Sequence, residues 1–192
     1  MNIVLIGYRA TGKSTVGRIL SRKLKMSFWD TDLLVEKKMA IPIKEIVALH
    51  GWEYFRLKEK EVIQTMAQRE SGIVSTGGGV VLDQGNVNLL KQTGVIIWLN
   101  APVQDIVDRL NKDAQSRATR PQFTAGNIAQ ETIAIMEQRF PLYEEAADYT
   151  VNTKDKKALQ VAEEIYQYLL KSGNLSKINK SKKTNAKNIK SC

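Results

Sequence analysis

The chain has 192 residues, of which 43% are hydrophobic and 26% charged, the composition of one ordinary globular domain. Its one cysteine, Cys192, excludes an intramolecular disulfide and a cluster of thiolate metal ligands. No apolar run approaches the ~20 residues of a membrane span, and residues 1–6 lack the basic start of a signal peptide. We therefore expect a cytoplasmic protein with no membrane association.

The net charge of +9 is concentrated near the C-terminus. Residues 171–192 contain seven lysines and no acidic residue, which leaves 22 basic against 20 acidic residues in the rest of the chain. This segment is rich in lysine, asparagine and serine and has no aromatic residue, so we expect a solvated, disordered tail with no specific nucleic-acid binding. A weak contact with nucleic acid or an acidic partner is the alternative. The folded domain is expected to cover residues 1–170.

Apolar runs separated by stretches of helical periodicity predict an α/β domain. The predicted strands are residues 2–6, 27–29, 72–76, 95–99 and 149–151. The predicted helices are residues 13–25, 33–38, 43–49, 52–70, 87–93, 103–110, 127–147 and 156–170. Their alternation predicts a parallel five-stranded sheet flanked by helices on both faces.

Residues 7–14 match the pattern G-x-x-x-x-G-K-[ST] between the first predicted strand and the first predicted helix. Glycines allow the backbone to curl so that its N–H groups point at phosphate oxygens, and the helix adds the positive end of its dipole. Lys13 is expected to reach the β- and γ-phosphates, and the Ser14 hydroxyl to ligate Mg²⁺. The alternative, a glycine-rich turn with an exposed lysine, explains less of the pattern.

Two more segments place ligand-binding groups at the carboxyl ends of predicted strands, where ligands bind in parallel sheets. Asp30 and Asp32 follow the second strand, and strand periodicity puts residues two apart on the same face. One carboxylate can hold the hydration shell of a metal and the other can accept a proton; helix capping is the alternative. Gly77, Gly78 and Gly79 follow the third strand and indicate close approach of a ligand, or else a flexible turn.

The polar stretch 111–125 is long for a connection in a compact domain, so we expect a mobile functional loop. It contains Arg117 and Arg120. An arginine on a mobile lid can close over phosphates and neutralise the charge of the transition state.

Two further arginines lie in predicted helices. Arg56 precedes Glu59 by three residues, so the two can pair; taken alone, an exposed surface ion pair is the simpler interpretation. Arg139 precedes Pro141, which we expect to interrupt or kink the helix. A charge that interacts with the C-terminal end of that helix is the alternative role of Arg139.

In this order and at these separations, the motifs resemble those of the shikimate kinase family. The resemblance covers positions 1 to about 170 and rests on residues 7–14, Asp30 with Asp32, Phe55 and Arg56 with Glu59, residues 77–79, Arg120 with Pro121, and Arg139 before Pro141, Leu142 and Tyr143. It implies a P-loop kinase fold with a substrate-binding helical segment at about 31–62 and a mobile lid at about 111–125. The implied activity is the ATP-dependent phosphorylation of the 3-hydroxyl of shikimate, which gives shikimate 3-phosphate and ADP in aromatic amino acid (chorismate) biosynthesis.

The resemblance also implies individual roles, in a protein expected to be a monomer. ATP would be bound by Gly7, Ala10, Thr11, Gly12, Lys13, Ser14, Thr15, Arg109, Arg120 and Lys154. Mg²⁺ would be held by Ser14 and Asp30, and shikimate by Asp32, Arg56, Gly78, Gly79 and Arg139. The catalytic groups would be Lys13, Asp32 as the candidate base, and Arg120 as the lid arginine.

Other classes of protein remain as alternatives at this point. The nearest is another small-metabolite kinase of the same fold, such as a gluconate kinase, which the paired aspartates, the three glycines and the two helical arginines disfavour. A nucleoside monophosphate kinase would share the phosphate loop and the lid. A GTPase-like switch needs an Asn-Lys-x-Asp run, and residues 111–113 lack its spacing. A nucleic-acid-binding protein would bind through the tail, and salt would weaken that binding.

Overall fold

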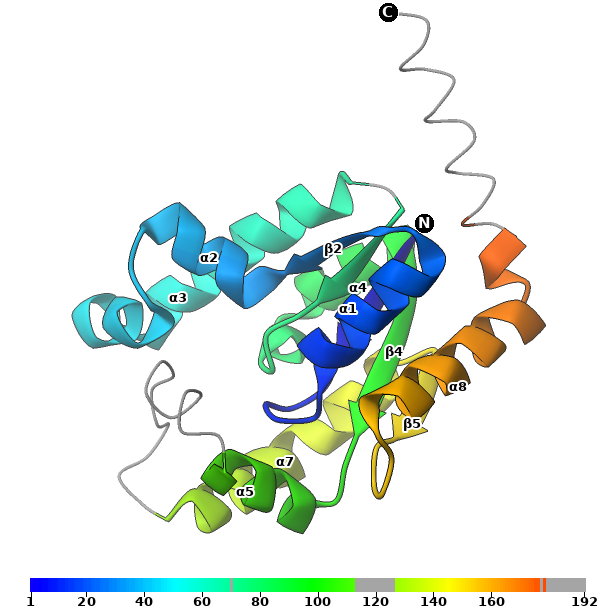
Figure 1. Cartoon of the computed structure of the whole chain (residues 1–192). Helices are drawn as coiled ribbons and strands as arrows, with labels where there is room; N and C mark the ends of the chain where they lie inside the picture. The colour runs from blue at the N-terminus through cyan, green and yellow to red at the C-terminus, as the bar shows by residue number, and fades with distance from the viewer. Residues whose placement is uncertain (70, 113–126, 177, 179–192) are drawn as a thin grey trace, which may run out of the picture.

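Five parallel strands in the order β2-β3-β1-β4-β5 form the centre of this computed structural model (Figure 1). The structure describes residues 1–69, 71–112, 127–176 and 178. The strands are β1 (Asn2–Ile6), β2 (Ser27–Asp30), β3 (Gly72–Ser75), β4 (Gly94–Asn100) and β5 (Tyr149–Asn152). The predicted parallel five-stranded sheet is confirmed.

The central strand β1 is buried along its whole length. Ile3 pairs with Ile73 of β3 on one side and with Val95 of β4 on the other. A parallel strand with neighbours on both edges and helices on both faces reads as a continuous apolar run, as β1 does. The outer strands β2 and β5 are partly exposed, which explains why their sequence signal is shorter.

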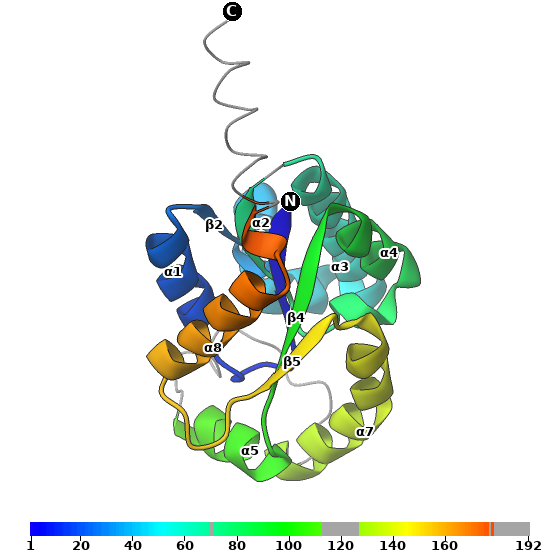
Figure 2. The ribbon, with the colours of Figure 1, turned by 90° about the vertical axis from the view of Figure 1, so that its right-hand side faces the viewer.

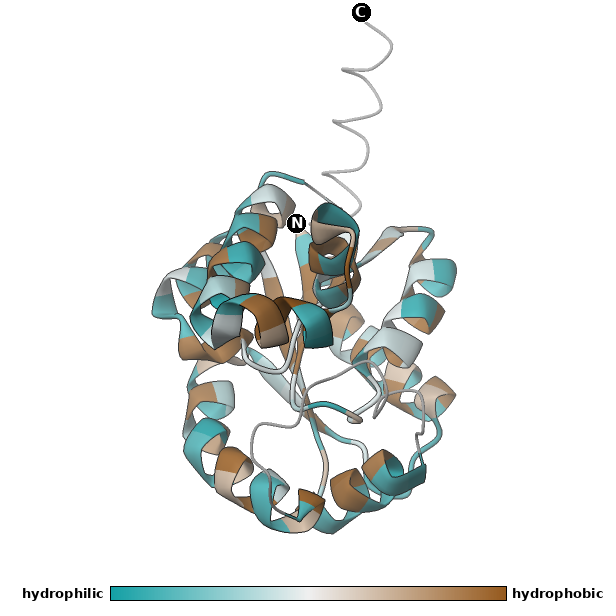
Figure 3. Ribbon diagram, turned by 90° about the vertical axis from the view of Figure 1, so that its left-hand side faces the viewer, coloured by the Kyte–Doolittle hydropathy of each residue, from teal (hydrophilic) through white to brown (hydrophobic). Residues whose placement is uncertain are grey.

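Helices cover both faces of the sheet (Figure 2). One face carries α1 (Lys13–Leu24) and α8 (Ala158–Lys171), which pack on each other; the other carries α3 (Ile43–Ala67), α4 (Gln84–Thr93) and α7 (Ile128–Ala146). The remaining helices are α2 (Thr31–Met39), packed on α3, α5 (Val103–Lys112), packed on α7, and the 3₁₀ turn η1 (Val80–Leu82). Figure 3 shows hydrophobic and hydrophilic residues alternating around these helices, as expected where one face packs on the sheet.

A small core of its own lies between α2 and α3, apart from the two cores that flank the sheet. Val35 of α2 is fully buried against Ile46 and Phe55 of α3. We call this group, with Ile43, Val62 and Met66, the α2–α3 cluster. It fixes the helical segment that carries Asp32 and Arg56.

Two helices differ from simple expectations. The predicted helices 43–49 and 52–70 form one element, α3, with a break at Gly51, whose φ of 81° and ψ of 172° are not helical. Helix α7 continues past Pro141 to Ala146, so Arg139 lies inside the helix, and the interpretation of Arg139 as a C-terminal charge is wrong. The buried side chains of Tyr143 and Ala146 offset the cost of the proline.

The folded part of the chain extends beyond residue 170, where we expected it to end. Leu175 packs against the core formed by α1 and α8, and Ile178 is 1% exposed within that core. A lysine-rich composition hides these two isolated apolar residues from pattern analysis. The rest of the predicted tail, residues 179–192 with Lys177, lies outside the described residues. Within the described ranges, no helix has the length and hydropathy needed to cross a bilayer.

Candidate active site

The loop between β1 and α1 has the backbone of a phosphate cradle. Gly7 and Gly12 have φ values of 138° and 91°, which favour glycine. A Cβ atom on Gly7 would also lie 2.5 Å from the Leu99 carbonyl oxygen. Ala10 has a left-handed φ of 61°, a conformation that costs a non-glycine residue free energy and occurs at functional sites. The residues of the loop thus allow the tight backbone curvature that a phosphate-binding loop requires.

The Tyr8 carbonyl ties this loop together. It accepts hydrogen bonds from the Lys13 Nζ and the Thr11 Oγ1, both at 2.8 Å. Within the described residues no side chain caps Gly12 at the start of α1, so the first N–H groups of that helix are open to an anion. Lys13 is 8% exposed. When a nucleotide binds, its ammonium can donate to phosphate oxygens in place of the Tyr8 carbonyl.

Ser14 and Asp30 form an oxygen site beside the loop. The Ser14 hydroxyl donates to the Asp30 Oδ2 at 2.6 Å and lies 3.3 Å from the Ser75 Oγ. One carboxylate and two hydroxyls suit Mg²⁺, which takes oxygen ligands and keeps positions for water and phosphate. Among the described residues no three His, Cys, Asp or Glu side chains gather into a denser metal site. The residues present therefore fit a magnesium–nucleotide complex.

Asp30 and Asp32 point to different places, which corrects the expectation that they share one face. Asp30 ends β2 and caps α2, because its Oδ1 accepts from the N–H groups of Asp32 and Leu33. Asp32 already belongs to the first turn of α2 and lines a neighbouring pocket. Strand periodicity fails here because the strand ends at Asp30. The capping alternative is correct for Asp30, but it does not exclude the metal role.

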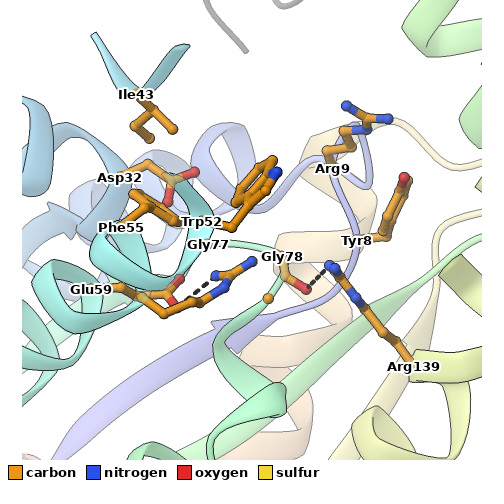
Figure 4. Close-up of a pocket in the computed structure, with 12 residues that line it drawn as sticks. Tyr8, Arg9, Asp32, Ile43, Trp52, Phe55, Glu59, Gly77, Gly78 and Arg139 are labelled. Atoms are coloured by element: carbon orange, nitrogen blue, oxygen red, sulfur yellow. Dashed lines mark hydrogen bonds and ion pairs between the residues drawn. The ribbon is translucent and has the colours of Figure 1, made fainter. Parts of the chain in front are cut away.

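That pocket lies beside the phosphate loop and encloses about 460 Å³ of empty space, including its opening (Figure 4). The pocket is lined by Tyr8, Arg9, Asp32, Ile43, Trp52, Phe55, Arg56, Glu59, Gly77, Gly78, Gly79 and Arg139. Three guanidinium groups and two carboxyl groups thus meet in one small space, a composition suited to a hydroxylated anion.

Arg56 and Glu59 form a partly buried ion pair. The Arg56 Nη1 lies 2.7 Å from the Glu59 Oε2, and the Glu59 side chain is 2% exposed. The interpretation as an exposed surface ion pair is therefore wrong, because Glu59 is buried and both side chains line the pocket. Burial raises the pKa of Glu59, Arg56 opposes that shift and Asp32 adds to it. The Glu59 Oε1 has no hydrogen-bond partner among the described residues.

Arg139 reaches the same pocket from α7. Its Nη1 donates to the Gly78 carbonyl at 3.1 Å, a bond marked in Figure 4. Burial lowers the pKa of Arg139, and the nearby Arg56 lowers it further, whereas Tyr143 opposes the shift. Two guanidinium groups that repel each other in a poorly solvated space are stabilised by an anion between them. Arg56 and Arg139 are thus placed to hold a carboxylate.

The three glycines leave room for these side chains. A Cβ atom on Gly77 would lie 2.5 Å from the Asp32 Oδ1 and 2.6 Å from the Glu59 Oε1. A Cβ atom on Gly79 would collide with the Arg56 guanidinium. The turn is therefore glycine-rich because charged side chains pack directly on its backbone, which disfavours the flexible-turn alternative.

Comparison with known proteins identifies the family. The family model described as shikimate kinase matches residues 9–170. The chain belongs to the shikimate kinase family. The shikimate kinase of Syntrophus aciditrophicus is 38% identical over 172 residues, which cover 85% of this chain and 88% of that protein. A solved shikimate kinase from Acinetobacter baumannii, in complex with shikimate, has a TM-score of 0.84 at 33% identity and covers 89% of this chain and 93% of that chain.

A second curated relative agrees in length and similarity. The shikimate kinase of Moorella thermoacetica is 39% identical over 168 residues, which cover 88% of this chain and 94% of the relative. The shikimate kinase family has a P-loop kinase fold and uses ATP as co-substrate, so the α/β fold, the kinase class and the resemblance stated from the sequence are confirmed.

Of the residues expected to bind the adenine end of the nucleotide, Arg109 and Lys154 lie in the described part of the chain. Arg109 donates to the Ala10 carbonyl at 3.4 Å and, by two nitrogens, to Thr153 at 3.2 Å. It thereby joins the phosphate loop to the loop after β5. Lys154 lies in that same loop and is exposed. Arg117, Arg120 and most of the expected lid at 111–125 lie outside the described residues; only Asn111 and Lys112 are described, as the end of α5.

Sequence reasoning missed part of the pocket. Tyr8 and Arg9 line it although they stand inside the phosphate-loop motif, and Arg9 forms an ion pair with Glu131 at the start of α7. Glu131 is 4% exposed, so the pair ties the loop to the helix that follows the expected lid. Trp52 also lines the pocket. Trp52 precedes Arg56 by four residues, so helical periodicity places the two on the same face of the helix, and this spacing could have indicated its role.

Proposed function

We propose that this chain transfers the γ-phosphoryl group of ATP to the 3-hydroxyl of shikimate, with Asp32 as the base and Arg56 and Arg139 as the carboxylate ligands. The observation that carries the proposal is that Asp32 and the two arginines converge on one glycine-lined pocket beside the phosphate loop. Shikimate is a small carboxylated polyol. A pair of guanidinium groups can bind its carboxylate through two parallel hydrogen bonds each, while a carboxylate orders its hydroxyls.

The transfer step has a simple atom balance. Asp32 accepts the proton of the 3-hydroxyl as its O–H bond breaks. The freed oxygen forms a bond to the γ-phosphorus, and the bond from that phosphorus to the bridging oxygen breaks, so ADP leaves. Lys13 and the N–H groups at the start of α1 stabilise the charge that develops on the transferred group. The pocket walls hold the two substrates in line, which is most of what this chemistry requires.

Mg²⁺ and the adenine are assigned to the other end of the site. Ser14 and Asp30 would hold the cation, which when bound neutralises charge on the β- and γ-phosphates. Gly7, Ala10, Thr11, Gly12 and Thr15 complete the phosphate and ribose side of the loop. Arg109 would stack on the adenine because its guanidinium is already fixed by Thr153. Lys154 and the lid arginine, Arg120, complete the nucleotide site in this proposal.

The proposal includes a monomeric, cytoplasmic enzyme, since every group named above comes from one chain. Light scattering of the purified protein tests the monomer directly. A single mass near 21.6 kDa is expected, and a stable dimer would contradict it.

The deciding experiment is a coupled ADP-release assay with MgATP and one acceptor at a time. We expect turnover with shikimate and less than about 1% of that rate with gluconate or a nucleoside monophosphate, because a pocket built to pair a carboxylate and hydroxyls rejects acceptors that leave those groups unpaired. Faster turnover with gluconate would favour the other small-metabolite kinase. An Asp32→Asn variant should lose activity, while Asp155→Asn, at an exposed position, should keep it.

A further inference from the structure

The Gly78 carbonyl is held from one side by two residues of α7. Arg139 donates to it at 3.1 Å, and the Tyr143 hydroxyl donates to it in a short hydrogen bond. Residues four apart on a helix lie on the same face, so one turn of α7 delivers both donors. Gly78 is part of the glycine turn that lines the pocket.

Tyr143 is a rigid donor. Its side chain is fully buried, and its ring stacks on Trp98 with centroids 5.6 Å apart. Burial raises the pKa of the Tyr143 hydroxyl, which keeps it protonated and able to donate. Arg139, in contrast, also has to serve the substrate carboxylate. The Tyr143 hydroxyl has no such role toward the substrate, although it also interacts with the Arg139 side chain.

Fixing this carbonyl fixes the next N–H group as well. In a trans peptide the C=O and the following N–H point in opposite directions. Because the Gly78 carbonyl accepts from two residues of α7, the Gly79 N–H points away from α7. Gly79 itself lies against α3, since a Cβ atom on it would collide with the Arg56 Nη2. Within the described part of the chain, the N–H groups of Gly78 and Gly79 have no recorded partner. A turn of three glycines has little stiffness of its own to maintain that orientation.

We propose that Tyr143 is a positioning residue for the phosphoryl transfer: its hydroxyl holds the Gly78 carbonyl so that the Gly79 N–H faces the acceptor substrate. This inference rests on the assignment of the pocket to shikimate made above. Tyr143 itself touches no substrate. Its effect passes through one peptide group, which donates to an oxygen of the bound acceptor and sets the orientation of that acceptor relative to Asp32.

The test is Tyr143→Phe, which keeps the ring on Trp98 and removes the hydroxyl. We expect kcat/KM for shikimate to fall about 5- to 30-fold, the equivalent of one or two lost hydrogen-bond increments, with a lower kcat as well as a higher KM because the bound acceptor is misaligned. The Kd for MgATP should change less than twofold. The matched control is Tyr168→Phe, whose hydroxyl also donates to a backbone carbonyl, that of Asp148, away from the pocket.

The Tyr143 hydroxyl also interacts with Arg139, so its effect could pass through that side chain instead of the Gly78 carbonyl. Repeating the substitution in an Arg139→Lys variant distinguishes the two routes. If the hydroxyl acts through the carbonyl, Tyr143→Phe still lowers kcat/KM in an Arg139→Lys variant. If the substitution has no effect in that background, the hydroxyl acts through Arg139 and the proposal is overturned. Wild-type kinetics for Tyr143→Phe, or equal losses of shikimate and MgATP binding, also overturn it.

A measurement on the unmodified chain covers the case in which Tyr143→Phe does not fold. In protein labelled with ¹⁵N-glycine, saturating shikimate should shift the Gly79 amide resonance and slow its hydrogen exchange. An unchanged Gly79 amide in an enzyme that phosphorylates shikimate overturns the positioning role and leaves the proposed function intact. A chain that fails to phosphorylate shikimate at all overturns the proposed function and this inference with it.

Discussion

The phosphate side and the acceptor side of the site are built in different ways. The core of the phosphate side is one continuous strand–loop–helix segment, residues 7–14, whose positive-φ glycines and uncapped helix start present backbone N–H groups beside the Lys13 side chain. The acceptor side is assembled from α2, α3, the turn after β3 and α7, and presents charged side chains, of which Glu59 and Arg139 are buried. Backbone donors cost little to preorganise, whereas buried charges require partners.

The difference indicates which side of the site is stabilised more by its bound substrate. On the acceptor side, the Glu59 Oε1 is without a partner among the described residues, and burial disfavours the charge on Arg139. An anionic, hydroxylated ligand relieves both conditions. We therefore expect the acceptor to organise its own pocket more than the nucleotide organises the loop, and five substitutions can test this contrast.

The largest effect is expected for Lys13→Ala on the phosphate side. Loss of the ammonium that stabilises the developing charge should lower kcat at least about 10²- to 10³-fold. The fold should persist, because Lys13 sits at the loop and the start of α1 rather than in a core. Steady-state kinetics and circular dichroism check this. Lys23→Ala, in the same helix and half-exposed, is the control; a kcat near the wild-type value for Lys13→Ala would refute the phosphate assignment.

The next effect is expected for Arg139→Lys and Arg56→Lys on the acceptor side. Lysine cannot reproduce the two parallel hydrogen bonds of a guanidinium. Losing one charged bond in a desolvated pocket should raise the shikimate KM about 30- to 1,000-fold. The Kd for ATP, measured by titration without shikimate, should change less than threefold.

Arg22→Lys, at an exposed position of α1, is the control for both arginine variants. If either pocket variant weakens ATP binding more than shikimate use, that arginine belongs to the phosphate side, and the division between the two sides fails there.

A smaller effect on catalysis, but a clear one on stability, is expected for Ile178→Ala. Ile178 is buried in the core beneath α1 and α8, so the substitution should lower the free energy of unfolding by about 2 to 5 kcal/mol. Denaturant unfolding measures this, and Leu170→Ala, 44% exposed, should cost less than about 1 kcal/mol. Both variants should keep kcat at 25 °C. An unchanged unfolding free energy for Ile178→Ala would mean that the chain after α8 does not stabilise the phosphate side.

The smallest effect concerns Glu59 and pH. Its folded-state pKa is raised above the ordinary 4.5, so the folded protein binds this proton more tightly than the unfolded chain. Its contribution to stability is therefore fully present below about pH 4.5 and is lost as the pH rises through the raised value. Glu59→Gln should remove that loss, so the unfolding free energy of the variant minus that of wild type should rise with pH, by at most about 1.4 kcal/mol per unit.

Glu61→Gln is the matched control, two residues along α3. Hydrogen bonds from Lys38 and Lys58 lower the pKa of the exposed Glu61 carboxyl, so any pH dependence of this control has the opposite sign. A difference that falls with pH for Glu59→Gln would show that the ion pair with Arg56 outweighs burial on the acceptor side.

The same contrast explains what the sequence could predict. The phosphate loop was predictable because its chemistry and its neighbouring strand and helix lie within one short segment. The pocket was predictable only through the combined order of motifs, since Arg56 alone looks like a surface residue and Arg139 like a helix terminus. Tertiary packing decided both cases, and it also let α7 continue through Pro141.

Other features had no signal that local patterns could carry. Whether Asp32 belongs to a strand or a helix depends on where β2 ends, and the ends of elements are set by capping at Asp30 rather than by periodicity. The burial of Ile178 depends on contacts with helices far away in the sequence. Tyr8 and Arg9 lie inside the phosphate-loop motif, whose pattern leaves their positions unspecified and so gives no signal that they line the acceptor pocket.

The α2–α3 cluster has a consequence for how this enzyme can change over evolution. The segment that carries Asp32 and Arg56 rests on its own small core, and Gly51 interrupts the helix that leads into it. Substitutions within that segment alter the shape of the acceptor pocket while the sheet and the phosphate loop keep their packing. Substitutions in this cluster can therefore change which acceptors fit beside Asp32 and Arg56, while Arg139 on α7 and the phosphate loop stay in place.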